Sequence, residues 1–175
     1  MCLINLFIVL WSPVILCAQT TEYKVKAVFL ERFTRFIEWP ESSAIADTSK
    51  PFILGIIGKN PFGLALEEFY AYQKIRNKKV EIRYFSNPDG IEKCHLLFIS
   101  HSNKTQLSRI LSRIRNKPIL SVSDTKNFAE EGVLINFYIA ENKIRFEINE
   151  SEARKSGLSI SYLLLKMAKI TNPSE

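Results

Sequence analysis

The sequence contains few cysteines, glycines and prolines, and each shortage excludes a class of protein. Its 175 residues include three Cys, six Gly and seven Pro. This composition excludes a disulfide-rich scaffold, a collagen-like repeat and a disordered Pro- and Gly-rich chain. Hydrophobic residues make up 46% and charged residues 24% of the chain. These values and the length are typical of a single globular domain.

The first 18 residues contain no Asp, Glu, Lys or Arg. This apolar stretch is shorter than the roughly 20 residues of a membrane-spanning helix, and Ser12 and Pro13 interrupt it. We therefore predict a signal peptide over residues 1–18, cleaved after Ala18, and a mature, exported domain over residues 19–175. A lipid anchor on Cys17 is the alternative, although Leu16 is large for the position before a lipidated cysteine.

Export changes the interpretation of the charge and of the cysteines. The net charge is +6, and in a cytoplasmic protein such an excess would indicate nucleic acid. For an exported protein we predict no nucleic-acid partner, and the basic clusters at residues 74–79 and 113–117 fit helix ends, anionic lipid or an acidic partner instead. Cleavage leaves Cys94 as the one remaining cysteine, so we predict no disulfide within the mature chain.

Motifs of known catalytic or cofactor sites are also missing. Gly58 and Gly63 have the spacing of a phosphate-binding loop, but the Lys and Ser/Thr that should follow are absent. His95 and His101 lack the short ligand spacing of a zinc site, and no Gly-x-Ser-x-Gly elbow is found. We therefore predict no enzyme, metal or cofactor. An unrecognised enzyme would need one of these histidines close to Asp124 or a serine in a pocket.

Hydrophobic periodicity predicts an alternation of helices and strands. Helices are expected at residues 21–39, 60–72, 103–115 and 158–170, and strands at 52–58, 80–85, 95–100, 119–122, 133–140 and 143–149. Strands that alternate with helices favour a partly parallel sheet, whereas the last two strands, joined by Glu141 and Asn142, read as a hairpin. We predict a single α/β domain whose partly parallel sheet is flanked by helices, with a C-terminal antiparallel hairpin and a closing helix.

Six segments in order resemble the YfiR-like family of bacterial periplasmic proteins. They are KAVFLERFTRFIEWP at 26–40, FILGIIGKNPFG at 52–63, CHLLFI at 94–99, ILSVSD at 119–124, IRFEIN at 144–149 and GLSISYLLLKMA at 157–168. Phe128, Ala129 and Gly132 add to the fourth segment, and together these segments cover nearly the whole predicted mature chain. Cys94 matches a family cysteine, but the cysteine that would pair with it is absent from this sequence.

The resemblance implies a periplasmic regulator that forms homodimers and has no enzymatic activity. The best-understood family members bind the periplasmic region of an inner-membrane diguanylate cyclase and repress it until an outer-membrane lipoprotein sequesters the regulator. Cyclic-di-GMP and biofilm formation then rise. Two alternatives stay open for this chain: a small-molecule sensor, with a ligand at the glycine turn after the first strand, or an accessory subunit of an envelope receptor such as a histidine kinase.

Aromatic and hairpin residues are the candidates for partner contact. They are Phe36 and Trp39 at the end of the first helix, and an apolar and charged patch expected to be exposed, made of Phe137, Tyr138, Ile139, Arg145, Glu147, Leu158 and Ile160. Phe36 and Trp39 also fit a packed helix end, because aromatic side chains serve both in cores and at interfaces. Asn149 fits a cap of a following turn or helix.

Overall fold

The computed structural model describes the backbone of residues 14–171 and the side chains of residues 21–171. The predicted signal peptide, residues 1–18, therefore lies largely outside the described residues. A seven-stranded sheet has the order β3-β2-β4-β5-β6-β7-β9. Its strands are β2 (Phe52–Ile57), β3 (Val80–Phe85), β4 (Leu96–Ile99), β5 (Leu120–Ser123), β6 (Ile135–Ala140), β7 (Lys143–Ile148) and β9 (Lys169–Ile170). Only β6 and β7 pair antiparallel among these strands.

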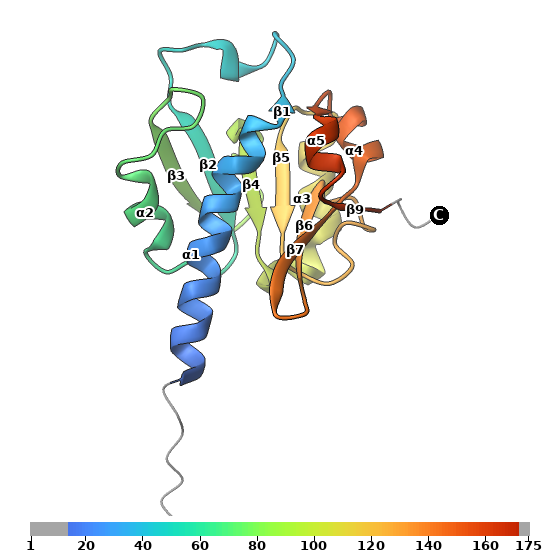
Figure 1. Cartoon of the computed structure of the whole chain (residues 1–175). Helices are drawn as coiled ribbons and strands as arrows, with labels where there is room; N and C mark the ends of the chain where they lie inside the picture. Colours follow the sequence, from blue (N-terminus) through green and yellow to red (C-terminus); the bar gives the residue numbers. More distant parts are fainter. Residues whose placement is uncertain (1–13, 172–175) are drawn as a thin grey trace, which may run out of the picture.

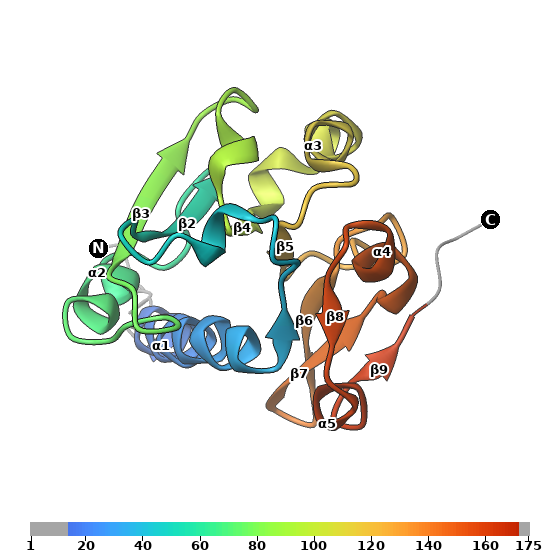
Figure 2. The ribbon, with the colours of Figure 1, turned by 90° about the horizontal axis from the view of Figure 1, so that it is seen from above.

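Helices cover both faces of this sheet (Figures 1 and 2). The long helix α1 (Val14–Arg35) and α2 (Ala65–Tyr70) lie on one face, and α3 (Leu107–Ile114) lies on the other. The remaining elements are α4 (Glu150–Lys155), α5 (Tyr162–Leu165), the short turns η1 (Ala44–Ala46), η2 (Ile91–Lys93) and η3 (His101–Gln106), and a separate pair of strands, β1 (Ile37–Glu38) and β8 (Ser159–Ile160). The predicted α/β fold class is confirmed.

Alternation along the strands divides the core into two apolar clusters. Leu54 and Phe98 point to the α1 face, whereas Leu97 and Ile99 point to the α3 face, and all four side chains are fully buried. Strands that are buried on both faces have continuous apolar sequences, so the central strands were predictable from their runs of apolar residues.

Two of the predicted helices differ from the structure. The first predicted helix is wrong at its C-terminal end, and the last is wrong along most of its length. The first ends at Arg35, because Ile37 and Glu38 pair with β8 and the residue before Pro40 disfavours helical dihedrals. Residues 158–170 form β8, α5 and β9 in place of one helix. Gly157 has φ +75° before this segment, and Thr171 N donates to Ile148 O at 2.9 Å after it. Strand pairing with distant residues overrides the local helical pattern.

Two other helices are shorter than predicted. Asn60 Oδ1 accepts from Phe62 N at 2.9 Å, so it closes a local turn and α2 begins only at Ala65. The segment from residue 103 divides into η3 and α3. The hairpin of β6 and β7 is confirmed, and its turn residues Glu141 and Asn142 have φ of 52° and 58°, as a two-residue hairpin turn requires.

Asn149 caps α4, as predicted. Its Oδ1 accepts from Glu152 N at 3.1 Å, and its Nδ2 donates to Ala129 O at 2.7 Å. The side chain is completely buried. One residue therefore caps α4 and ties it to the segment that leads into β6.

Gly55 lies in the middle of β2, where the neighbouring Cys94 leaves no room for a side chain. A Cβ at this position would be 2.5 Å from Cys94 Sγ. We expect Gly55→Ala to lower the free energy of unfolding by about 1–3 kcal/mol through overpacking, measured by urea denaturation. The double variant Gly55→Ala/Cys94→Ala should regain part of this loss. Equal stability of wild type and Gly55→Ala would show that the strand relaxes freely.

Candidate partner-binding surface

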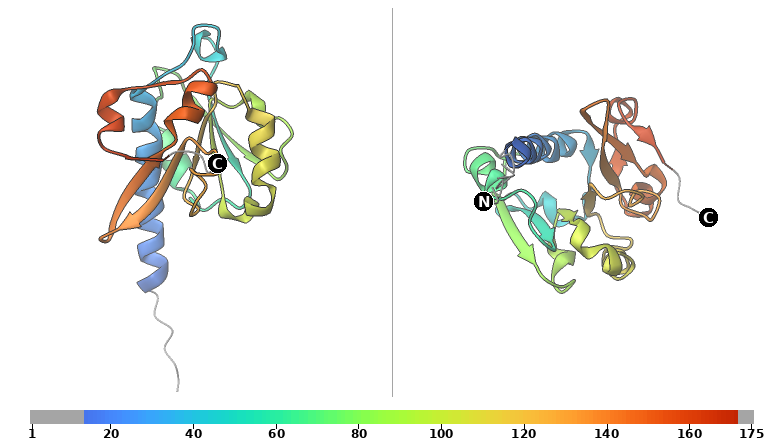
Figure 3. Two further views of the ribbon diagram at one scale, coloured as in Figure 1. Left: turned by 90° about the vertical axis from the view of Figure 1, so that its right-hand side faces the viewer. Right: turned by 90° about the horizontal axis from the view of Figure 1, so that it is seen from below.

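An apolar groove of about 310 Å³ lies between α1 and α5. The two helices lie on the same side of the sheet (Figure 3). The residues that line the groove, called the α1–α5 groove below, are Phe29, Arg32, Phe33, Arg35, Phe36, Phe146, Leu164 and Met167. Those from α1 recur at three- and four-residue spacing, which places them on one side of the helix.

Aromatic contacts fix the floor of this groove. The ring of Phe33 is stacked on Phe137, with centroids 5.4 Å apart, and meets Phe146 edge-on at 5.0 Å. Phe29 lies 5.8 Å from Phe33 and 5.9 Å from Phe137. Such packed aromatic groups hold their positions, so the groove is a preformed feature.

Two arginines of α1 lie at the rim of the groove, and one of them is paired with a carboxylate. Arg35 Nε donates to Glu31 Oε1 at 2.7 Å, and this hydrogen bond raises the pKa of the Arg35 guanidinium. Arg32 is exposed and has no ion-pair partner among the described side chains. An apolar floor with a basic rim suits a protein segment that carries apolar and acidic side chains together.

Exposed apolar side chains are concentrated beside the groove. Among residues 21–171, nine large hydrophobic side chains are substantially exposed, and four of them belong to one stretch of nine residues at α5 and β9. They are Tyr162, Leu163, Met167 and Ile170. A concentration of exposed apolar groups of this kind is typical of a contact surface, whereas isolated ones are ordinary.

The hairpin residues predicted for partner contact converge on a second cleft, of about 540 Å³. Phe137, Tyr138, Ile139 and Glu147 line it, together with Asp124, Lys126, Asn127, Glu130 and Lys169. Ile139 is exposed, but Phe137 and Glu147 are buried. Glu147 accepts a hydrogen bond from Asn136 Nδ2 at 3.1 Å and forms an ion pair with Lys169 at 3.3 Å. The buried carboxylate thus joins β6, β7 and β9.

The other predicted contact residues lie apart from this cleft. Phe36 is half-buried in the α1–α5 groove, Ile160 pairs with Ile37, and Arg145 is exposed opposite Tyr138 in the hairpin. Trp39 is buried against Phe52, and Leu158 is buried as well. The expectation of one exposed patch is therefore wrong for Phe137, Glu147 and Leu158, because Phe137 and Leu158 pack in the core and the buried Glu147 carboxylate bonds Asn136 and Lys169. Their role in partner contact stays a prediction.

A buried ion pair joins α1 to the end of β5, and the sequence pattern gave no sign of it. Lys26 Nζ lies 2.6 Å from Asp124 Oδ2 and 2.6 Å from Glu22 Oε1. Tyr23 OH donates to Asp124 Oδ2 at 2.7 Å. Burial and the neighbouring carboxylate raise the pKa of the Tyr23 hydroxyl, which therefore stays protonated as a donor. This cluster fixes α1 against the sheet and so positions the α1–α5 groove.

His95 and Cys94 are structural in this fold. His95 Nδ1 accepts from Ile53 N at 2.9 Å, and the ring is stacked on Phe52. Burial raises the pKa of the Cys94 thiol to about 12, so the thiol is protonated and unreactive at neutral pH. Cys94 is thus a buried small hydrophobic residue in this fold, and His95 is held by a backbone partner at the start of its strand.

The buried His95 should make stability depend on pH. Burial, with a smaller contribution from Lys78, lowers the His95 pKa below its ordinary value of 6.5. The unfolded chain takes up a proton near pH ~6.5 and the folded chain only at lower pH. The stabilisation that the neutral His95 ring contributes is therefore complete above about pH 6.5 and is lost as the pH falls below that value. Urea denaturation at pH 7.5 and 5.0 should show a smaller acid-induced loss in His95→Asn, and an equal loss would contradict this.

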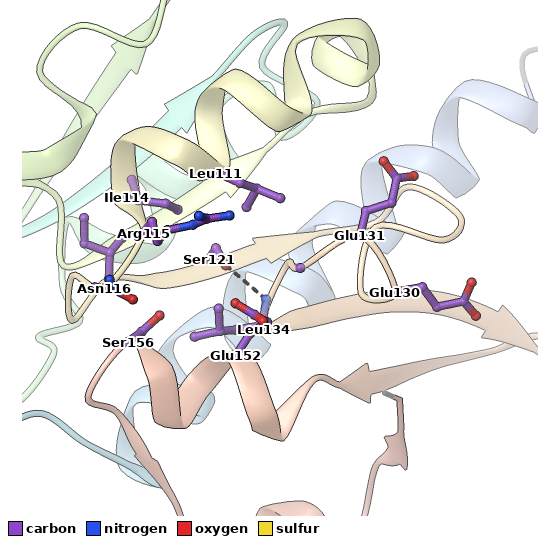
Figure 4. Close-up of a pocket in the computed structure, with 12 residues that line it drawn as sticks. Leu111, Ile114, Arg115, Asn116, Ser121, Glu130, Glu131, Leu134, Glu152 and Ser156 are labelled. Atoms are coloured by element: carbon purple, nitrogen blue, oxygen red, sulfur yellow. Dashed lines mark hydrogen bonds between the residues drawn. The ribbon is translucent and has the colours of Figure 1, made fainter. Parts of the chain in front are cut away.

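A polar pocket of about 220 Å³ lies between α3 and α4 (Figure 4). Arg115, Glu131 and Glu152 reach it from different elements, and Ser121 Oγ accepts from Leu134 N at 3.0 Å at its base. Within residues 14–171 we find no group of three or more His, Cys, Asp or Glu able to hold a metal ion. Over the same residues, none of the helices combines the length and the hydropathy of a membrane-spanning segment.

The glycine turn after β2 is filled by the chain itself. Lys59 N donates to Ser102 Oγ at 2.9 Å. Gly58 has φ +95°, and a Cβ there would lie 2.4 Å from Ser102 Oγ. The close approach of η3 therefore explains this glycine without a ligand.

Comparison with known proteins bears on the family and on the fold. A sequence model described as YfiR/HmsC-like matches residues 23–169. One similar solved structure is the ABC domain in complex with L-Trp from Streptococcus pneumonia, with a TM-score of 0.51 and 16% identity. The match covers 68% of this chain and 55% of that one, so this chain corresponds to about half of that protein. At this identity the likeness concerns the fold alone.

Proposed function

This chain belongs to the YfiR/HmsC-like family, and from this membership we propose that it is a periplasmic regulator that binds and represses an inner-membrane diguanylate cyclase. The family consists of periplasmic regulators of cyclic-di-GMP signalling rather than enzymes. The observation that best supports direct contact is the α1–α5 groove with exposed apolar residues beside it. Repression then requires only that the regulator binds the inactive conformation of the cyclase more tightly than the active one.

The chemistry of the groove defines the segment of the cyclase that fits it. Phe36 and Met167 offer apolar contact, and Arg32 offers an unpaired positive charge at the rim. An amphipathic helix with one or two large apolar side chains and a neighbouring carboxylate satisfies both features. We place such a segment in the periplasmic region of the cyclase.

Release from repression follows from competition for this surface. An outer-membrane lipoprotein that covers the same groove would remove the regulator from the cyclase and raise cyclic-di-GMP. Two copies of the chain acting as a homodimer would present two grooves and so match a dimeric cyclase. Avidity would then strengthen repression without any new contact.

The experiment that tests direct contact is affinity capture from detergent-solubilised envelopes, with bound proteins identified by mass spectrometry. We expect enrichment of a membrane protein that carries a diguanylate cyclase output domain. Met167→Glu should reduce its recovery by about tenfold or more, because it places a carboxylate in the apolar groove. Met167 is 62% exposed, so the substitution should leave folding nearly unchanged.

Leu64→Glu is the matched control, because Leu64 is 70% exposed and lies just before α2, away from the groove. It should capture the cyclase as wild type does. Enrichment of a histidine kinase in place of a cyclase would change the pathway and keep the contact mechanism. Equal recovery with Met167→Glu and Leu64→Glu would show that the groove is not the contact surface.

A further inference from the structure

The outermost strand of the sheet, β3, has one free edge. It pairs in parallel with β2 over all six residues, from Val80 to Phe85, and no other described strand pairs with it. An unpaired edge is a template for another strand unless charge, proline or a bulge blocks it. The sequence of β3, VEIRYF, contains no proline and forms an uninterrupted register with β2.

Hydrogen bonds at the two ends of β3 show which of its backbone groups face outward, away from β2. Phe52 N donates to Lys79 O, and Gly58 N donates to Phe85 O. Residues that bond to one neighbour alternate along a strand, so the odd-numbered residues of β3 turn their N–H and C=O groups toward β2. Val80, Ile82 and Tyr84 turn theirs away from the sheet. Among residues 14–171, none of these outer groups has a backbone partner.

Side chains on β3 then select a register for a second copy of the same strand. When two identical strands pair antiparallel about Ile82, Val80 lies opposite Tyr84 of the second copy, and Glu81 lies opposite Arg83. The neighbouring registers that keep the same outward residues place Glu81 opposite Glu81 or Arg83 opposite Arg83. Like charges directly opposite destabilise a sheet. Of these three registers, only the one about Ile82 combines outward-facing backbone groups with opposite charges.

We propose that two copies of this chain form a homodimer by antiparallel pairing of their β3 strands about Ile82. The three facing pairs of outward residues exchange two hydrogen bonds each, about six in all. This inference specifies the interface of the homodimer included in the proposed function, and it does not depend on the identity of the membrane partner. The interface is isologous, because each copy contributes the same strand.

The charged side chains of β3 remain able to bond across this interface. Within one chain Arg83 Nε donates to Glu81 Oε1 at 2.6 Å, which leaves the terminal guanidinium nitrogens and the second carboxylate oxygen available. Both side chains are substantially exposed. Two Glu81–Arg83 pairs across the two-fold axis therefore form without loss of the pairs within each chain.

Charge reversal tests the interface and its register together. We expect sedimentation velocity of the full wild-type chain, expressed with its own N-terminal segment, to show a concentration-dependent dimer. Glu81→Arg and Arg83→Glu should each weaken dimerisation by about tenfold or more, because facing residues then carry like charges. An equimolar mixture of the two variants should dimerise again. The ion pair within one chain cannot cause this recovery, since each variant still carries like charges on its own strand.

Circular dichroism establishes that both variants fold, and Arg109→Glu, an exposed residue of α3, is the matched control that should dimerise as wild type does. A monomeric wild type would overturn the homodimer itself. Dimers that persist in both variants would place the interface on another surface and overturn the role of β3. Variants that are monomeric alone and also in the mixture would overturn the register about Ile82.

Discussion

Replacement of Lys26 by methionine is expected to lower the free energy of unfolding by about 3–5 kcal/mol. The side chains of Lys26 and Asp124 are 4% and 10% exposed, so removal of the ammonium group leaves the Asp124 carboxylate buried without a countercharge. Tyr23 still donates to Asp124, but one neutral donor does not replace an ion pair. Domains of this size are stable by about 5–15 kcal/mol, so this variant should approach the threshold of unfolding.

Urea denaturation of four variants isolates the buried charge. Lys155→Met removes the exposed ion pair with Glu152 and should cost less than about 1 kcal/mol. Asp124→Asn should be strongly destabilising as well, because Lys26 then loses its buried countercharge. The double variant Lys26→Met/Asp124→Leu should recover much of the stability, since the apolar pair removes both deeply buried charges and the Glu22 carboxylate, which also loses Lys26, is 33% exposed. If Lys26→Met cost no more than Lys155→Met, the proposed role of the ion pair would be wrong.

Phe33→Ala is expected to destabilise the domain by about 3–5 kcal/mol. Phe33 is 1% exposed, and its ring meets Phe29, Phe137 and Phe146. The cavity left by the ring would be large because three other aromatic groups surround it. Since Phe33 also lines the α1–α5 groove, the variant should lose partner binding together with stability.

Phe33→Leu provides the comparison for this prediction, because it keeps an apolar side chain and leaves a smaller cavity. We expect it to cost about half as much as alanine in the same urea denaturation series. Met167→Glu separates the two effects, since it changes the groove and leaves the aromatic cluster intact. A loss below about 1 kcal/mol for Phe33→Ala would mean that the cluster repacks around the missing ring.

The central sheet was predictable from the sequence because its signals are local. Strands β2 and β4 are continuous apolar runs, and β3 and the hairpin have clear turns beside them. The pairing of Ile37 with Ile160 joins residues far apart in the chain, and no periodicity reports such a contact. For that reason the end of α1 and the whole segment from residue 158 to 170 differ from the predicted helices.

The candidate surface was predictable only in part, for the same reason. Phe36 was a candidate from its position at the end of an amphipathic helix, and it does line the groove. Met167 was not a candidate, because the sequence predicted one continuous helix over residues 158–170. That prediction did not show which residues of the segment would be exposed and which would be buried. Lys26 and Asp124 are ordinary charged residues in sequence, and only the packing of α1 on β5 brings them together.

The most direct test of the proposed function measures cyclic-di-GMP in cells of the native host. We expect the concentration to rise severalfold when the gene for this chain is deleted. Expression of wild type or of Leu64→Glu should return it to the original value, whereas Met167→Glu, exported in equal amount, should leave it high. An unchanged concentration after deletion, under conditions in which the chain is produced, would contradict repression of a diguanylate cyclase by this protein.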